Sequence, residues 1–99
     1  MPEQLVGVTT MTDDFDPASA VQAAAAGDHQ AWERLVDHYA GPVRAVTGRF
    51  GLAEDDATDV YQTTFLRLLE HIDRLEQPAR VGSWLEAAAR DECRRRLAG

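Results

Sequence analysis

The sequence predicts an all-α protein, a small bundle of about four helices. Apolar residues recur at helical spacing in several windows, most clearly at Trp32, Leu35, Val36 and Tyr39. Helix-start and helix-stop residues separate these windows, and no segment alternates apolar and polar residues as a strand would. A length of 99 residues allows one small core. We therefore expect a flexible leader, residues 1–15, and one helical domain, residues 16–99.

The first expected helix covers about residues 17–26. Asp16 can cap the free N–H groups at its start, and Pro17 suits the first helical position, where its missing N–H costs nothing. Gly27 should end this helix, and Asp28 can cap the next one.

The second helical window is interrupted by Gly41-Pro42, which should break or kink it, because proline lacks a backbone donor and clashes with the preceding turn. The apolar stripe nevertheless continues beyond this point, which favours one bent helical rod over residues 28–50. The continuing positions are Val43, Val46 and Phe50.

A third, long helix should follow Gly51. Glu54, Asp55 and Asp56 lie in its first turn, where carboxylates meet the positive end of the helix dipole. Its apolar stripe is too wide for one buried seam, so we expect a second partner, which could be another protein. The stripe consists of Ala57, Val60, Tyr61, Thr64, Phe65, Leu68, Leu69, Ile72 and Leu75.

Residues 73–82 are predicted to form a loop, since Pro78 and Gly82 punctuate them. Ser83 and Glu86 have the spacing of a capping box, which predicts a last helix from Trp84 to about Leu97. The inner face of this helix should carry Leu85, Ala88 and Ala89.

Charge and composition exclude several classes of protein. A net charge of −7 argues against coating nucleic acid by charge alone, although residues 80–99 carry five arginines against three acids. No segment is long and apolar enough for a membrane span or signal peptide, so we expect a cytoplasmic protein without membrane contact. Cys93 is the single cysteine, so an internal disulfide is excluded. We expect Cys93 to serve simply as a small residue on a helix.

No catalytic constellation is visible. The three histidines, His29, His38 and His71, lack the spacing of a metal site. Acids at 54–59 could hold a hard cation, but carboxylates at a helix start more often serve the helix dipole. We therefore expect no enzyme, no catalytic residue, no metal and no cofactor, with a small helical enzyme using Asp55, Asp56 and Asp59 as the remote alternative.

Several separated motifs resemble region 2 of the extracytoplasmic-function (ECF) sigma factors of bacterial RNA polymerase. The resemblance covers about residues 18–97 and implies a region 2 helical bundle. Residues 56–67 are similar to the family signature Asp-Ala-Glu-Asp-Val-x-Gln-Glu-Thr-Phe-x-Arg. The other matching segments are Ala26-Gly27-Asp28, Ala31-Trp32, Leu35 to Tyr39, and Trp84-Leu85.

The resemblance implies docking on core RNA polymerase, at a coiled coil in the clamp of the largest subunit. The alternative for the matching positions is a solvated helix face. These positions are Asp56, Asp59, Gln62, Thr63, Leu66 and Arg67.

It also implies that the loop at residues 73–80 captures an unstacked base of the melted −10 promoter strand. Trp84 either stacks on that base or anchors the last helix in the core. The later arginines either follow the DNA backbone or favour the helix C-terminus electrostatically. The implied DNA-binding residues are Arg74, Glu76, Gln77, Arg80, Trp84, Arg90, Arg94, Arg95 and Arg96.

The sequence departs from the family pattern in the last helix. Asp91 replaces a common asparagine, and Glu86 and Glu92 stand where apolar residues are common, which puts negative charge beside the expected DNA surface. We expect no helix-turn-helix domain (region 4), which reads the −35 element in the family, within these 99 residues. Two functions remain: promoter recognition in transcription initiation, or a sigma-like interaction module bound by an anti-sigma or other regulatory protein.

Overall fold

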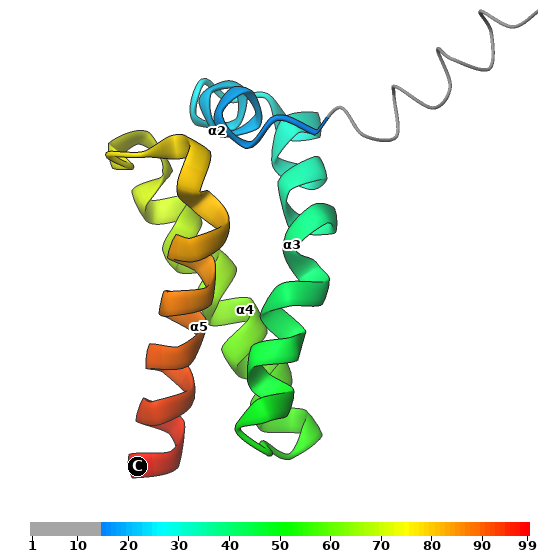
Figure 1. Cartoon of the computed structure of the whole chain (residues 1–99), viewed down its shortest axis with the longest axis vertical. Coiled ribbons are helices and arrows are strands. Elements are labelled where there is room, and N and C mark those ends of the chain that lie inside the picture. The colour runs from blue at the N-terminus through cyan, green and yellow to red at the C-terminus, as the bar shows by residue number, and fades with distance from the viewer. Residues whose placement is uncertain (1–14) are drawn as a thin grey trace, which may run out of the picture.

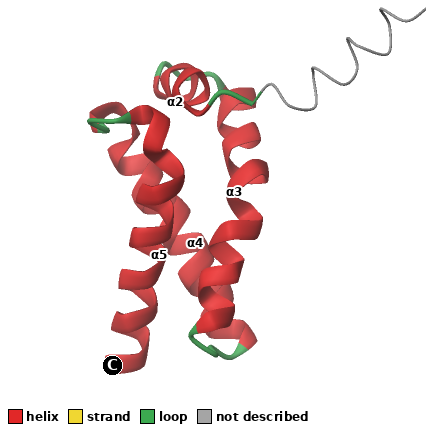
Figure 2. Ribbon diagram, in the orientation of Figure 1, coloured by secondary structure: helices red, strands yellow, loops and turns green. Residues whose placement is uncertain are grey.

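The computed structural model describes residues 15–99, which fold into four α-helices joined by short connections (Figures 1 and 2). No strand occurs within that range, so the all-α prediction is confirmed. The helices are α2 (Pro17–Ala25), α3 (His29–Arg49), α4 (Glu54–His71) and α5 (Val81–Ala98), with the 3₁₀ turns η1 (Ile72–Arg74) and η2 (Pro78–Arg80) between α4 and α5.

Three long helices form the body of the bundle, and α2 lies across one end of it (Figure 1). The short helix contacts α3 and both 3₁₀ turns, while α4 packs against α3 and α5. One continuous core results, because each helix turns its apolar face toward the others. The largest fully buried side chains include Leu35, Val43, Val46, Leu68, Val81 and Leu85.

The predicted boundary residues act as expected at three of four positions. Gly27 and Gly51 have φ angles of 103° and 67°, which suit glycine. Asp28 caps α3 by accepting hydrogen bonds from the N–H groups of Gln30 and Ala31. Asp16 precedes α2 without capping it, since its carboxylate instead accepts a hydrogen bond from the Ser19 hydroxyl at 2.7 Å.

The predicted interruption at Gly41-Pro42 does not break α3, which runs as one helix from His29 to Arg49. Pro42 is exposed, so water can satisfy the carbonyl that lacks a donor. Val43 and Val46 are fully buried beyond the proline and hold the second half of the helix on the same core.

The last helix begins at Val81, three residues before the predicted start, so the predicted capping box at Ser83 and Glu86 is wrong. Ser83 lies inside α5 and makes no cap, because η2 leads directly into the helix. Gly82 is also helical rather than part of a loop. A Cβ atom at Gly82 would lie 2.8 Å from the Tyr39 ring, so the glycine permits the close packing of α5 on α3.

The expected leader lies outside the described residues except for its last position, Phe15. The Phe15 ring stacks on His38 at a centroid distance of 3.9 Å and meets Tyr39 edge-on. Phe15 therefore belongs to the folded domain. No helix in the described range is long and apolar enough to cross a membrane.

Candidate functional site

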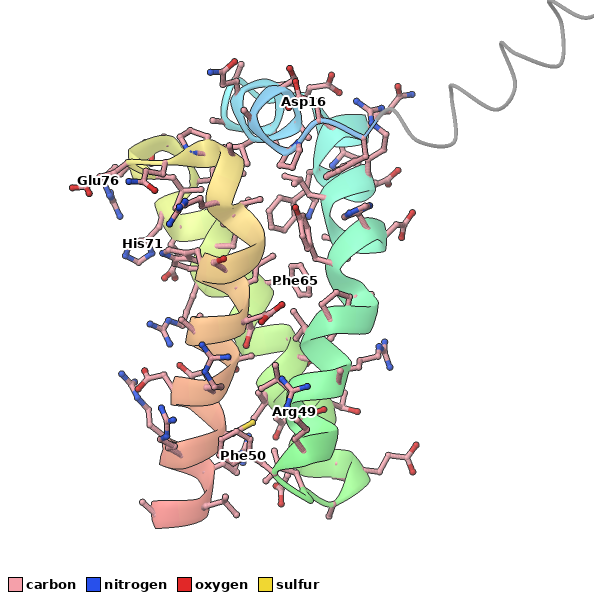
Figure 3. All side chains as sticks on the ribbon, viewed as in Figure 1. Asp16, Arg49, Phe50, Phe65, His71 and Glu76 are labelled. Atoms are coloured by element: carbon pink, nitrogen blue, oxygen red, sulfur yellow. The ribbon has the colours of Figure 1, made fainter. Side chains whose placement is uncertain are left out.

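A cleft of about 480 Å³ opens where the α4–α5 connection meets the start of α5. All four predicted loop residues, together with Trp84, contribute to its walls, and Figure 3 shows His71 and Glu76 projecting on this side of the molecule. The lining residues are His71, Arg74, Leu75, Glu76, Gln77, Arg80, Ser83 and Trp84.

Buried residues on either side of the connection fix the cleft in place. Ile72 and Val81 are buried, so the chain between them is anchored at both ends while its polar residues face outward. The Arg74 guanidinium donates from Nη2 to the backbone oxygen of Glu70 at 3.0 Å, which ties this side chain to the end of α4. The chain that forms the wall of the cleft is therefore attached to the core at both ends.

Trp84 serves both structural and surface roles. It is half-buried and packs against the core cluster, and it also lines the cleft. Its ring centroid lies 6.0 Å from that of His71, with the planes tilted by 44°. The two sequence interpretations of Trp84, core anchor and wall for a base, are thus compatible.

Sequence reasoning missed three lining residues: His71, Leu75 and Ser83. His71 is the last residue of α4, and its only sequence signal is its position two residues before the predicted loop. The spacing of Ser83 and Glu86 predicts a cap at Ser83, whereas the structure starts α5 at Val81 and places Ser83 inside the helix.

The predicted docking residues divide between two sides of α4. Gln62 and Leu66 are exposed to solvent, with Leu66 58% exposed. Asp56 and Asp59 instead approach Arg96 of α5, at 3.6 and 2.9 Å. Because Asp56 and Asp59 pair with Arg96, their negative charge is partly neutralised within the domain.

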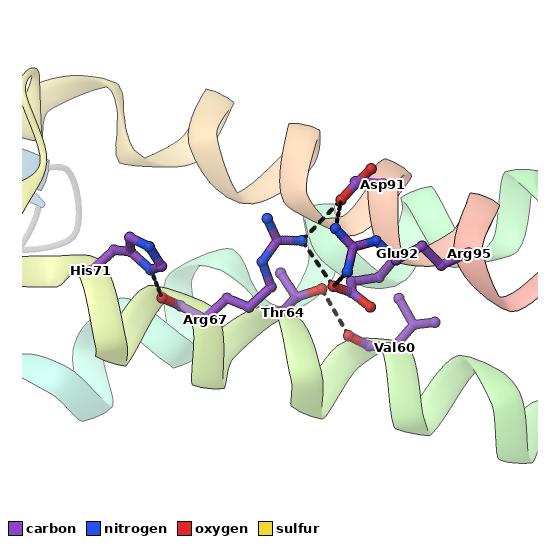
Figure 4. A network of polar contacts seen from close by, with 7 residues as sticks. All are labelled: Val60, Thr64, Arg67, His71, Asp91, Glu92 and Arg95. Carbon is purple, nitrogen blue, oxygen red and sulfur yellow. Dashed lines mark hydrogen bonds and ion pairs between the residues drawn. The ribbon is translucent and has the colours of Figure 1, made fainter.

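Arg67 also faces α5 rather than open solvent (Figure 4). Its Nη1 atom donates to Glu92 at 2.8 Å and lies 3.3 Å from the Asp91 carboxylate. Arg95 pairs with Asp91 at 3.1 Å. Two of the three acids that depart from the family pattern, Asp91 and Glu92, therefore bind arginines of the same domain, which explains their presence without reference to DNA.

The predicted DNA-binding arginines of α5 do not join the cleft. Arg90 lies 3.9 Å from Glu86, and the Arg94 guanidinium lies 6.0 Å from the centre of the Phe50 ring. Helical rise places Arg94 about 15 Å beyond Trp84 along α5. The predicted DNA-binding set thus consists of a cleft group and a separate group along the second half of α5.

The wide apolar stripe of α4 finds its second partner mainly within the domain, because α4 packs on both α3 and α5. Val60, Thr64 and Leu68 are buried by this packing. Leu69, at 51% exposed, remains uncovered near Leu66 and forms with it an apolar surface on the outer side of α4.

Within residues 15–99, no group of three or more His, Cys, Asp or Glu side chains is arranged to hold a metal ion. Cys93 is fully buried against the core, and burial raises the pKa of its thiol. It lies on α5, as the sequence predicted, and the structure places it in the interior.

The sequence model of the family described as Sigma-70 region 2 matches residues 35–99. This stretch contains most of α3 together with all of α4, the cleft and α5. No curated protein and no solved structure matches the chain.

Proposed function

Because the chain belongs to the sigma-70 region 2 family, whose domains bind core RNA polymerase and open promoter DNA without covalent chemistry, we propose that it recognises the melted −10 strand in transcription initiation. The observation that carries the proposal is the cleft, in which Arg74, Glu76, Gln77, Arg80 and Trp84 come together. The chain would work in the cytoplasm, where polymerase and promoter are found.

An unstacked base needs a flat or apolar wall and polar groups at its edge. Trp84 and Leu75 supply the wall, and Glu76 and Gln77 supply hydrogen-bonding groups that can reach a base edge. Arg74 and Arg80 carry the positive charge that attracts the phosphates on either side of the captured nucleotide. The cleft therefore combines the parts required for a single-stranded ligand.

Polymerase docking would use α4, as the resemblance to ECF sigma factors implies. The exposed Gln62 and Leu66 are available for contact with a partner, and the Asp56 and Asp59 carboxylates lie at the edge shared with α5. The ECF subtype is part of the proposal and rests on the signature at residues 56–67 and on Trp84-Leu85. The clamp coiled coil is the proposed partner.

Crosslinking in the assembled holoenzyme tests promoter reading. A photoreactive group on single-stranded −10 DNA should crosslink to residues 74–84, and the crosslink should disappear with duplex DNA alone. Replacing Trp84 by alanine should abolish it, whereas Arg94→Ala, outside the cleft, should leave it unchanged. Absence of any crosslink, with polymerase binding and helicity intact, would overturn the assignment of the cleft to DNA.

A pull-down with the clamp coiled coil tests docking separately. Leu66→Ser should weaken capture, because it removes an exposed apolar contact without opening the core. Arg90→Ala, which changes a partly exposed side chain on α5, is the control and should leave capture unchanged. Wild-type protein that keeps its helicity but is not captured would contradict docking.

The exposed pair Leu66 and Leu69 favours the second candidate function, an interaction module bound by an anti-sigma or other regulatory protein. The two functions predict different effects of substitutions in the cleft and on α4. In a reconstituted transcription assay, Trp84→Ala should lower promoter opening under the first function. Under the second, the cleft variant should leave regulator binding intact, and Leu66→Ser with Leu69→Ser should abolish it.

A further inference from the structure

His71 has a fixed orientation at the rim of the cleft. Its Nδ1 atom lies 2.9 Å from the backbone oxygen of Arg67, one helical turn earlier (Figure 4). A carbonyl oxygen can only accept a hydrogen bond, so Nδ1 must carry the proton of the neutral ring. The other ring nitrogen, Nε2, then presents a lone pair and has no hydrogen-bond partner among residues 15–99.

Where it meets the exocyclic position of a base, a fixed acceptor distinguishes the bases by one chemical group. Adenine and cytosine each carry an exocyclic amino group that donates hydrogen bonds, whereas thymine carries an acceptor oxygen at the corresponding position. A lone pair attracts the amine and repels the oxygen. Selection of amino-bearing bases is therefore the expected consequence of His71 Nε2.

The arginines of the cleft cannot perform this selection. Guanidinium groups only donate, so Arg74 and Arg80 cannot accept from an amine. Glu76 and Gln77 can also accept and are exposed, as is His71, but no hydrogen bond within the described residues fixes either of their side chains. His71 is held by the backbone of its own helix, so binding a base through it costs less side-chain entropy.

We propose that His71 is a specificity-determining residue of the cleft and favours an unstacked base that bears an exocyclic amine, adenine or cytosine, over thymine. This inference rests on the proposed capture of a promoter base. It assigns a class of base to the cleft, because it depends on the His71 side chain and on the contact of its Nδ1 atom with the Arg67 carbonyl oxygen.

The test uses the full chain assembled with core polymerase and short single-stranded probes. Each probe is an oligothymidylate carrying one adenine, or one purine that lacks the 6-amino group, at each position in turn. At the captured position, wild-type holoenzyme should bind the adenine probe about three- to ten-fold more tightly than the purine probe, as one hydrogen bond allows. Cytosine and its 4-deamino analogue should behave in the same way.

Two variants isolate Nε2. His71→Phe keeps a flat ring without a lone pair, and His71→Asn keeps a donor close to the Arg67 carbonyl without an acceptor at the Nε2 position. Both should reduce the adenine-to-purine ratio toward one. The control, His29→Phe, changes an exposed histidine on α3, which pairs with Glu33 away from the cleft, and should keep the wild-type ratio. A merely structural role would weaken both probes equally and leave the ratio unchanged.

Each outcome decides the inference. Amino discrimination that is lost in both His71 variants supports it. Binding of all probes without discrimination, or discrimination that survives both variants, overturns the role of His71 and leaves promoter-strand binding intact. Failure of the wild-type holoenzyme to bind any probe overturns both the role of His71 and the proposed function.

Discussion

Replacing Arg67 by methionine should destabilise the domain, because Glu92 would lose its closest cation. The Glu92 side chain is 14% exposed and that of Arg67 31%, so their contact at 2.8 Å is largely shielded from water. Exposed ion pairs contribute about 0.2–1 kcal/mol, whereas removal of one partner from a buried pair costs about 3–5 kcal/mol. Arg95, 4.0 Å from Glu92, can compensate in part. We expect a loss of about 1–2 kcal/mol, between these limits.

Urea unfolding followed by circular dichroism measures this loss as a shift in midpoint at constant slope. A double-mutant cycle with Glu92→Met then isolates the pair, since the double variant leaves no unpaired charge. The coupling free energy should be about 1 kcal/mol and should fall only slightly at high salt, because the pair is shielded. Arg95→Ala, which changes a side chain 67% exposed, is the control and should cost less than about 0.5 kcal/mol. A coupling near zero would refute the claim that Arg67 joins α4 to α5.

Three further predictions concern local features of the fold, each measured by urea unfolding. Asp28→Ala should lower the unfolding free energy by about 1 kcal/mol, because two backbone N–H groups lose their acceptor, whereas Asp16→Ala should change it by less than about 0.5 kcal/mol; equal effects would contradict the assigned caps. Gly82→Ala should destabilise by about 1 kcal/mol or more, since the clash with Tyr39 outweighs the gain in helix propensity, and a more stable variant would show that the ring moves aside. Burial raises the pKa of the Cys93 thiol, so the contribution of the thiol to stability is complete below its unfolded-state pKa and is lost as pH rises through its folded-state pKa. Alkaline solution should therefore lower the unfolding free energy of the wild type more than that of Cys93→Ala, and parallel curves of unfolding free energy against pH would contradict this prediction.

Local sequence signals predicted the parts of the fold that depend on neighbouring residues. Gly27 and Asp28 define the turn into α3, and the apolar spacing around Leu35 predicts the buried face that the structure shows. The loop residues Arg74 to Arg80 were predicted together because they are close in the chain, and they remain together in the cleft. Such features depend on the backbone geometry of a few adjacent residues, so the types of those residues are enough to predict them.

The start of α5 was mispredicted because two signals conflicted. Ser83 and Glu86 have capping-box spacing, but burial of Val81 favours a helix that begins earlier. Gly82 predicts a loop by its residue type, whereas in the structure it lies in α5 and leaves room for the Tyr39 ring of α3. Packing against a distant residue outweighed the local signal in both cases.

The sequence by itself determined the helices, most of their ends, the position of the loop and the membership of the sigma-70 region 2 family. Only the tertiary structure decided which predicted docking residues are engaged internally and which are exposed. Arg67 meets Glu92 across 25 positions of sequence, and Asp59 meets Arg96 across 37. No periodic pattern encodes such pairs, because they depend on how α4 and α5 lie against each other. The same packing brings the end of α4 beside Trp84, which places His71 in the wall of the cleft.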